Sequence, residues 1–176
     1  MQTISQSAEG NQLNRLVRRV RAWPLPEGLR RRIVTLGAGL TVPYLRTSAI
    51  ELHEVDGARV EVALKNRRKV QNHMKTVHAS AMFLLAESAT GTVLAANLPD
   101  GARFATTHIE IDYKRKARGD LKAVATLTEA QRHEVRTAPE GRLTVPVRLT
   151  DEDGNEPATF HIEWSWKQPR AARPAA

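Results

Sequence analysis

The segment from Val77 to Gly91 constrains the fold most strongly, because it is apolar on nearly every side. Alanine, leucine, methionine and phenylalanine dominate it, and Glu87 is its one charged residue. These residue types are good or tolerable in a helix, and Gly91 can end that helix. A helix without a polar face must be surrounded by protein, and this one is too short to span a bilayer. We therefore expect it at the centre of the domain.

Alternation of apolar and polar residues predicts strands on both sides of this helix. A hairpin is expected over about 46–65, with its turn at Asp56-Gly57. After the helix, further strands are expected over 104–113, 121–127, 143–149 and 160–166. In the first of these, Ala105, Thr107, Ile109 and Ile111 are expected on one face. This order indicates an α+β fold, an antiparallel sheet with a helix on one face. A curved sheet around a central helix is the hotdog architecture.

Two amphipathic helices are expected before the hairpin. Leucine and valine repeat at helical spacing from Leu13 to Val20, and apolar residues repeat again from Leu29 to Leu40. Prolines at 24 and 26 separate the two runs. We expect helices that pack on or cap the domain over residues 1–44, the hotdog domain over 45–168, and a flexible tail over 169–176.

Composition narrows the class of protein. The absence of cysteine excludes disulfides, thiolate catalysis and cysteine metal sites. Polar residues fill the N-terminal stretch, and no apolar run reaches the roughly 20 residues of a membrane span, so we expect a cytoplasmic protein. The six histidines form neither a His-x-x-x-His nor a His-Glu-x-x-His pair, so no metal site is expected.

The net charge of +8 admits an anionic partner. Basic residues gather in the ranges 15–32, 65–69 and 114–118. Aromatic residues make up only 5% of the chain, too few to form a row of platforms for stacking bases. We expect neither nucleic acid nor a membrane as the partner. The alternative is that the basic N-terminal helices bind nucleic acid or an anionic membrane.

Glu87 is the first candidate for chemistry. Burying a carboxylate is costly unless it is paired, and burial raises its pKa toward the range useful for acid–base or nucleophilic work. A glutamate at a solvent gap, or one that forms a hydrogen bond at a dimer interface, is the structural alternative.

Two further residues, Asn72 and His78, precede Glu87 at a characteristic spacing in the sequence. Asn72 lies six residues before His78, and Glu87 lies nine after it. This spacing resembles the active-site segment of the phenylacetate-pathway type of hotdog thioesterase. There, an asparagine precedes a His-Gly-Gly step that starts the central helix, and an acidic residue follows. The likeness covers about residues 46–167. It continues downstream with Tyr113, Lys114 to Ala117, Gly119-Asp120, Ala123 and Ala125.

The resemblance implies hydrolysis of an acyl-CoA thioester. Backbone N–H groups near Ala79 and Ser80 would polarise the thioester carbonyl, and Glu87 would act as general base or nucleophile. Asn72 would orient the water or the substrate carbonyl, and His78 would mainly shape the helix start. Further residues are expected to bind the substrate: Thr106 and Thr107 along the acyl pocket, and Lys114, Arg115, Lys116 and Arg118 near the CoA phosphates. No cofactor is expected beyond the coenzyme A moiety of the substrate.

The spacing also implies a second chain. Nine helical residues rise about 13.5 Å over two and a half turns, so His78 and Glu87 of one chain face opposite ways. Two antiparallel copies bring the helix start of one chain to the acid of the other, as the resemblance implies. We therefore expect a homodimer with composite sites, able to pair further into a tetramer.

The helix start departs from the family pattern, with His78-Ala79-Ser80 in place of His-Gly-Gly. Alanine and serine add side-chain atoms where glycine would let a ligand approach the backbone closely. A second interpretation is therefore a non-catalytic hotdog domain that binds an acyl-CoA or an acyl carrier.

Overall fold

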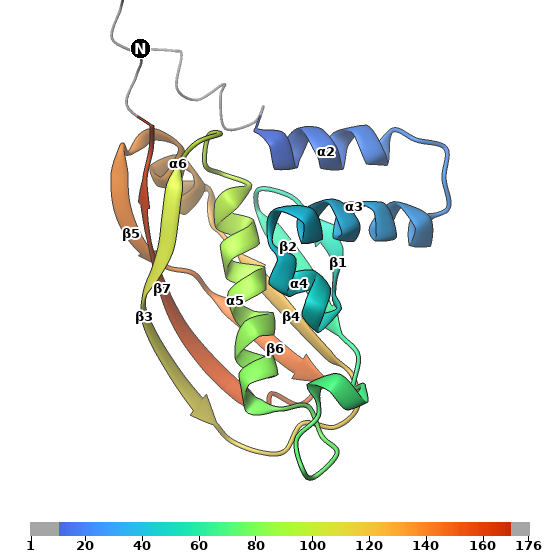
Figure 1. Ribbon diagram of the computed structural model, residues 1–176. Coiled ribbons are helices and arrows are strands. Elements are labelled where there is room, and N and C mark those ends of the chain that lie inside the picture. Colours follow the sequence, from blue (N-terminus) through green and yellow to red (C-terminus); the bar gives the residue numbers. More distant parts are fainter. Residues whose placement is uncertain (1–10, 170–176) are drawn as a thin grey trace, which may run out of the picture.

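The computed structural model describes residues 11–169, and Figure 1 shows the arrangement of its elements. In chain order these are α2 (Gln12–Arg21), α3 (Glu27–Thr41), α4 (Pro43–Ser48), β1 (Ile50–Val55), β2 (Arg59–Leu64), a 3₁₀ turn (Arg68–Val70), α5 (Ala79–Ala95), β3 (Arg103–Tyr113), β4 (Leu121–Thr126), α6 (Glu129–Thr137), β5 (Glu140–Thr144), β6 (Val147–Asp151) and β7 (Ala158–Lys167). The expected tail over 169–176 lies, apart from Pro169, outside the described residues.

Helix α5 stands in the middle of the domain, and the antiparallel strands curve around it (Figure 1). Leu85, Ala89 and Val93 on this helix are fully buried, so the predicted central position is confirmed. Gly91 does not end the helix, which runs on to Ala95. Its role is close packing, because a β-carbon at position 91 would lie 2.8 Å from the ring of Trp164.

The strands form two connected groups, ordered β1-β2-β4-β6 and β3-β7-β5. Pro146 separates β5 from β6, so the strand expected over 143–149 is in fact two, since proline has no N–H to give to the ladder. The groups meet there: Val145 N–H donates to the Ile162 carbonyl, and Thr126 N–H donates to the Pro146 carbonyl, both over 3.2 Å. The expected α+β hotdog architecture is confirmed.

Strand β3 carries a bulge that changes which of its residues face inward. The register against β7 shifts between Thr106 and His108. Thr106 is paired with the buried Trp164, and Ile109 with the buried Ile162. Directly opposed residues share a face, so Thr106 and Ile109 point toward the core side. The expectation that Ala105 and Thr107 share a face with Ile109 is wrong, because a bulge breaks the period of two.

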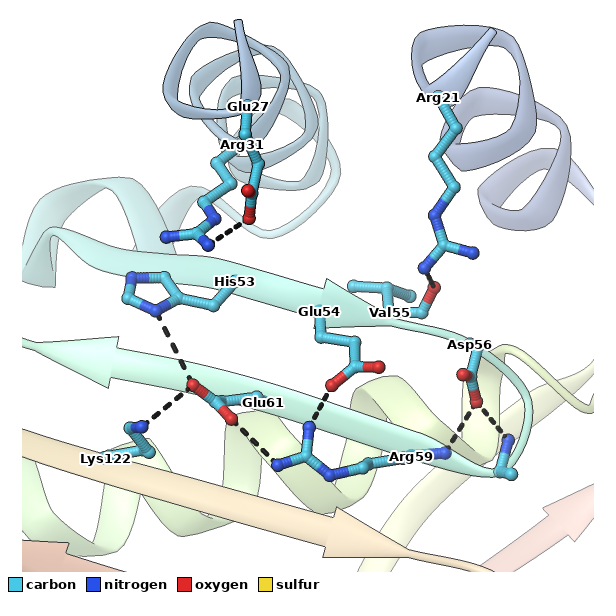
Figure 2. A network of polar contacts seen from close by, with 11 residues as sticks. Arg21, Glu27, Arg31, His53, Glu54, Val55, Asp56, Arg59, Glu61 and Lys122 are labelled. Atoms are coloured by element: carbon cyan, nitrogen blue, oxygen red, sulfur yellow. Dashed lines mark hydrogen bonds and ion pairs between the residues drawn. The ribbon is translucent and has the colours of Figure 1, made fainter.

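The N-terminal helices cover one edge of the sheet. Thr35 Oγ1 on α3 accepts the backbone N–H of Leu52 over 2.9 Å. Figure 2 shows the second contact, in which Arg21 on α2 donates to the Val55 carbonyl over 3.2 Å. These contacts satisfy backbone groups that an edge strand leaves unpaired. The sequence-based boundary was imprecise: the hairpin was expected from residue 46, yet 43–48 form α4, which ends at Ala49 with φ +56°.

Helix α6 was not expected from the sequence. Thr128 caps it, and a capping box joins Thr128 and Gln131 reciprocally. The T-x-x-Q spacing was the available signal, although the helix has only one buried residue, Val135. This weak apolar pattern is why periodicity did not reveal it.

Charged side chains form a network over β1, β2 and β4, shown in Figure 2. Arg59 bonds to Glu54 and to Glu61, and Lys122 Nζ lies 3.2 Å from Glu61 Oε1. Burial acts to raise the pKa of Glu61, but the hydrogen bonds from Arg59 and Lys122 outweigh it, so that pKa is lowered. The network is a structural one, and among the described residues no cluster of three or more metal-ligating side chains occurs.

Across residues 11–169, none of the helices combines the length and apolar character needed to cross a membrane.

Candidate active site around Glu87

A cavity of about 590 Å³ lies along one side of α5. Its floor is the row Glu87, Ser88, Gly91 and Ala95, which recur at helical spacing. The walls are mostly apolar and come from six other elements and the segment after α5: Leu13 and Leu16 of α2, Ala38 and Thr41 of α3, Leu45 of α4, Leu52 of β1, Leu98 to Ala102, Phe104 of β3 and Trp164 of β7. Its size and lining are typical of a small-molecule site.

Glu87 is the acidic group of α5 that faces this cavity. Burial raises the pKa of its carboxyl group. Among the described residues, none donates a hydrogen bond to the Glu87 carboxylate or forms an ion pair with it. A carboxyl group that is desolvated and unpaired beside an apolar cavity suits proton transfer or nucleophilic attack.

Two aromatic residues form part of the cavity wall. Trp164 Nε1 donates to the Thr90 hydroxyl over 3.1 Å. Phe104 packs on the Trp164 ring, with their centroids 5.7 Å apart. Both residues line the cavity, so β3 and β7 each contribute to its wall.

His78 caps the start of α5. Its Nδ1 accepts the N–H of Ser80 over 3.1 Å, and its carbonyl accepts the N–H groups of Ala81 and Met82. Ser80 therefore does not supply the unpaired donor that was expected of it. Among the described residues, Ala79 N–H has no acceptor, and the Ala79 carbonyl receives the Tyr113 hydroxyl over 3.1 Å. One of the two expected donors remains available.

Asn72 shapes the loop before the helix. Its Oδ1 accepts the N–H of Met74 over 2.9 Å and both the N–H and the hydroxyl of Thr76. Lys75 within this loop has φ +59°. The side-chain oxygen of Asn72 is therefore engaged in holding the turn, while its predicted role with water or substrate stays a prediction.

The other predicted binding residues lie outside the cavity of the single chain. Thr106 is half-buried opposite Trp164, and the exposed Thr107 donates its hydroxyl to Glu163 over 2.5 Å. The exposed cations Lys114, Arg115, Lys116 and Arg118 follow Tyr113, which contacts the start of α5. Arg115 forms a hydrogen bond with Asn155, and Arg118 forms an ion pair with Asp153.

The predicted residues thus form two groups. Glu87 lies in the cavity, midway along α5, whereas His78 caps the start of the helix, about 13.5 Å away along its axis. The loop held by Asn72 leads into this helix start, and Tyr113, which precedes the cations, contacts it. Sequence reasoning missed the cavity walls supplied by α2 and α3. The helical spacing of Leu13 and Leu16 was noticed, but it does not say that they face Glu87.

One protein-family model matches most of the chain. The family described as "Domain of unknown function (DUF4442)" matches residues 30–166. No curated protein sequence matches the chain significantly.

Several solved structures share the fold. A crystal structure described only as a genomics target matches with a TM-score of 0.68 and 28% identity, covering 89% of this chain and 99% of its own. A Pseudomonas aeruginosa protein described as "Probable Thioesterase" matches with TM-score 0.68 and 19% identity, covering 83% and 98%. A Haemophilus influenzae thioesterase matches with TM-score 0.57 and 14% identity, covering 73% and 85%.

Proposed function

The chain belongs to the DUF4442 family and has the fold of the thioesterases with which it superimposes, and from this premise we propose that it hydrolyses an acyl thioester. The observation that carries the proposal is the desolvated Glu87 carboxylate, which has no partner within residues 11–169 and lies at an apolar cavity large enough for an acyl chain. The substrate we propose is an acyl-CoA.

In the proposed reaction, the Glu87 carboxylate takes a proton from water while the water oxygen attacks the thioester carbonyl carbon. The negative charge that forms on the carbonyl oxygen is held by the Ala79 N–H at the positive end of the helix. The C–S bond then breaks, the thiolate takes up the proton, and a carboxylic acid and a free thiol are released. In the nucleophilic variant, a Glu87 carboxylate oxygen attacks the carbonyl carbon, the C–S bond breaks and the thiol is released after taking up a proton from water. A second water then hydrolyses the resulting anhydride, which releases the carboxylic acid and restores Glu87.

The two groups must come from two chains. Within one chain, Glu87 and Ala79 lie about 12 Å apart along the helix, too far to act on one carbonyl. We propose a homodimer in which the start of α5 in one copy faces Glu87 in the other. The cations from Lys114 to Lys116 lie beside the start of α5, where they would meet the phosphates of CoA.

Free thiol release from a panel of acyl-CoAs tests this function. Hydrolysis should fall by about 10²-fold or more in Glu87→Gln, which keeps the shape but loses the base. Glu134→Gln is the matched control, because Glu134 is exposed on α6, away from the cavity lining. Equal loss in both variants, or unchanged hydrolysis in Glu87→Gln, would contradict the assignment.

One observation favours a second function. The Ser80 N–H is already bonded to His78 Nδ1, which leaves fewer donors for an oxyanion. A domain that binds acyl-CoA or an acyl carrier without turnover fits this feature. Saturable binding of a non-hydrolysable acyl-CoA thioether, with no thiol release from the thioester itself, would identify this function.

A further inference from the structure

The N-terminal helices present leucine side chains to solvent on one face. Leu36 is 59% exposed, Leu40 is 77% exposed and Leu29 is 44% exposed. At 100° per residue these three positions lie within about 40° of one another around α3. The buried Val34 and the half-buried Ala38 lie on the other side of the helix, toward the domain. The exposed stripe is therefore not the face with which α3 packs.

The apolar stripe continues into the next turn of chain. Val42 and Tyr44 are 47% and 61% exposed, and both lie within four residues after Leu40. Trp23, just before α3, is 45% exposed. Leucine with tryptophan and tyrosine at its borders is the combination found where a helix enters the interface of a bilayer. We call the residues Leu29, Leu36, Leu40, Val42 and Tyr44 the leucine face.

Positive charge surrounds the leucine face. Residues 11–48 contain eight arginines, and Glu27 is their only acidic residue. Arg32 is exposed one turn from Leu29 and Leu36, and Arg46 packs its β-carbon near Gly39, next to Leu40. Within residues 11–169, neither Arg32 nor Arg46 forms an ion pair. The charges of these two arginines can therefore meet an anionic surface.

We propose that the leucine face, with its flanking arginines, docks the protein on an anionic lipid surface. A second copy of the same surface would bring the like charges together, which is unfavourable. Nucleic acid would use the arginines but gains little from exposed leucines, because phosphate contacts supply most of its binding energy. An anionic bilayer uses both features at once, the apolar area and the charge. From the sequence alone, an anionic membrane was only an alternative partner of these helices, because periodicity does not say which apolar residues of α3 remain exposed.

The docking surface adjoins the cavity at Glu87. Thr41 and Val42 line that cavity, and Val42 belongs to the leucine face as well. An acyl chain leaving the bilayer would therefore reach the cavity without a long passage through water. This consequence rests on the proposed function, whereas lipid docking does not require it.

Cosedimentation with vesicles tests the docking. We expect the wild-type protein to sediment with vesicles of phosphatidylcholine and phosphatidylglycerol (7:3), and not with phosphatidylcholine alone. Leu36→Gln/Leu40→Gln should bind about tenfold or more weakly, since the apolar area is lost. Arg32→Gln/Arg46→Gln should lose a comparable amount, and high salt should weaken the wild type, since screening acts on the charge.

Two control variants separate the leucine face from general effects. Met74→Gln replaces another exposed apolar side chain, and Arg142→Gln/Arg148→Gln removes two exposed charges from β5 and β6. Both should bind vesicles as the wild type does. Thermal melting should be nearly unchanged in every variant, because the replaced side chains are exposed.

Several results would overturn the proposal. One is absence of binding to the anionic vesicles, and another is equal binding by Leu36→Gln/Leu40→Gln. A third is an oligomer that dissociates in the leucine variant during sedimentation velocity, since the leucine face would then be a contact between copies. Thiol release measured in detergent-free buffer without vesicles stays a separate readout, so failure of docking and failure of the proposed hydrolysis are distinguishable.

Discussion

The indole nitrogen of Trp164 donates a hydrogen bond to the Thr90 hydroxyl over 3.1 Å, and so fastens β7 to the turn of α5 that follows Glu87. The Thr90 hydroxyl in turn lies 3.1 Å and 3.0 Å from the carbonyl oxygens of Ala86 and Glu87. Gly91 beside it leaves room for the Trp164 ring. The position of the carboxylate therefore depends on a strand that lies far away in the sequence.

Replacing Thr90 by valine should destabilise the domain, because the buried indole N–H of Trp164 would lose its acceptor. An unsatisfied buried donor costs about 1–3 kcal/mol. Urea denaturation measures this loss, with Thr150→Val on β6 as a threonine-to-valine control at a half-buried position. If Thr90→Val and the control have the same free energy of unfolding, the hydrogen bond from Trp164 to Thr90 does not contribute to stability.

Glu87→Gln should make the protein more stable at neutral pH. Burial raises the pKa of the Glu87 carboxyl in the folded state, so ionisation costs folding energy. That cost begins as the pH rises above the unfolded pKa of about 4.3 and is complete above the folded pKa. Thermal melting from pH 4 to pH 8 should therefore show a gain for Glu87→Gln that grows with pH. A gain independent of pH, or a loss at pH 8, would contradict the desolvation of Glu87.

Glu61→Gln should have the opposite effect. The folded pKa of Glu61 is lowered: the opposing effect of burial is outweighed by the hydrogen bonds from Arg59 and Lys122. The ionised form therefore adds stability that is present above pH about 4.3 and is lost as the pH falls through the folded pKa. We expect Glu61→Gln to lose about 1 kcal/mol at pH 7, a gap that closes in acid. Glu54→Gln, which removes the more exposed partner of Arg59, should lose less.

Local patterns in the sequence predicted the elements whose apolar periodicity is strong. The segment from Val77 to Gly91 has no polar face, so its central position followed from elementary burial energetics. The amphipathic helices and most strands were predicted for the same reason. Glu87 was found because a lone carboxylate in such a segment is costly and therefore conspicuous.

Features that depend on contacts between distant residues were not predicted. The bulge at Thr107 arises from pairing with β7, and the break at Pro146 from its place between two strand pairs. The cavity walls need the tertiary packing of α2 and α3 on α5. The capture of the Ser80 N–H by His78 depends on a side-chain rotamer, which no sequence pattern specifies.

Mixed dimers test whether each site draws on two chains. Ala79→Pro removes the free N–H at the first position of α5, where proline is tolerated, and the extended His78 before it suits proline. Alone, Ala79→Pro and Glu87→Gln should each be inactive. Mixed at random, they should regain about a quarter of wild-type thiol release, because half of the dimers contain one intact site of two. If mixed dimers form and no activity is recovered, each site must lie within one chain.

The pH dependence of kcat/KM for acyl-CoA hydrolysis tests most directly the claim that Glu87 acts as the base. For the wild type, kcat/KM should rise with pH to a plateau. The midpoint of the rise should lie above the ordinary glutamate pKa, because burial raises the pKa of Glu87. In Glu87→Gln the rise should disappear and the plateau should fall by about 10²-fold or more. A Glu87→Gln profile that keeps the wild-type midpoint and plateau would contradict the account.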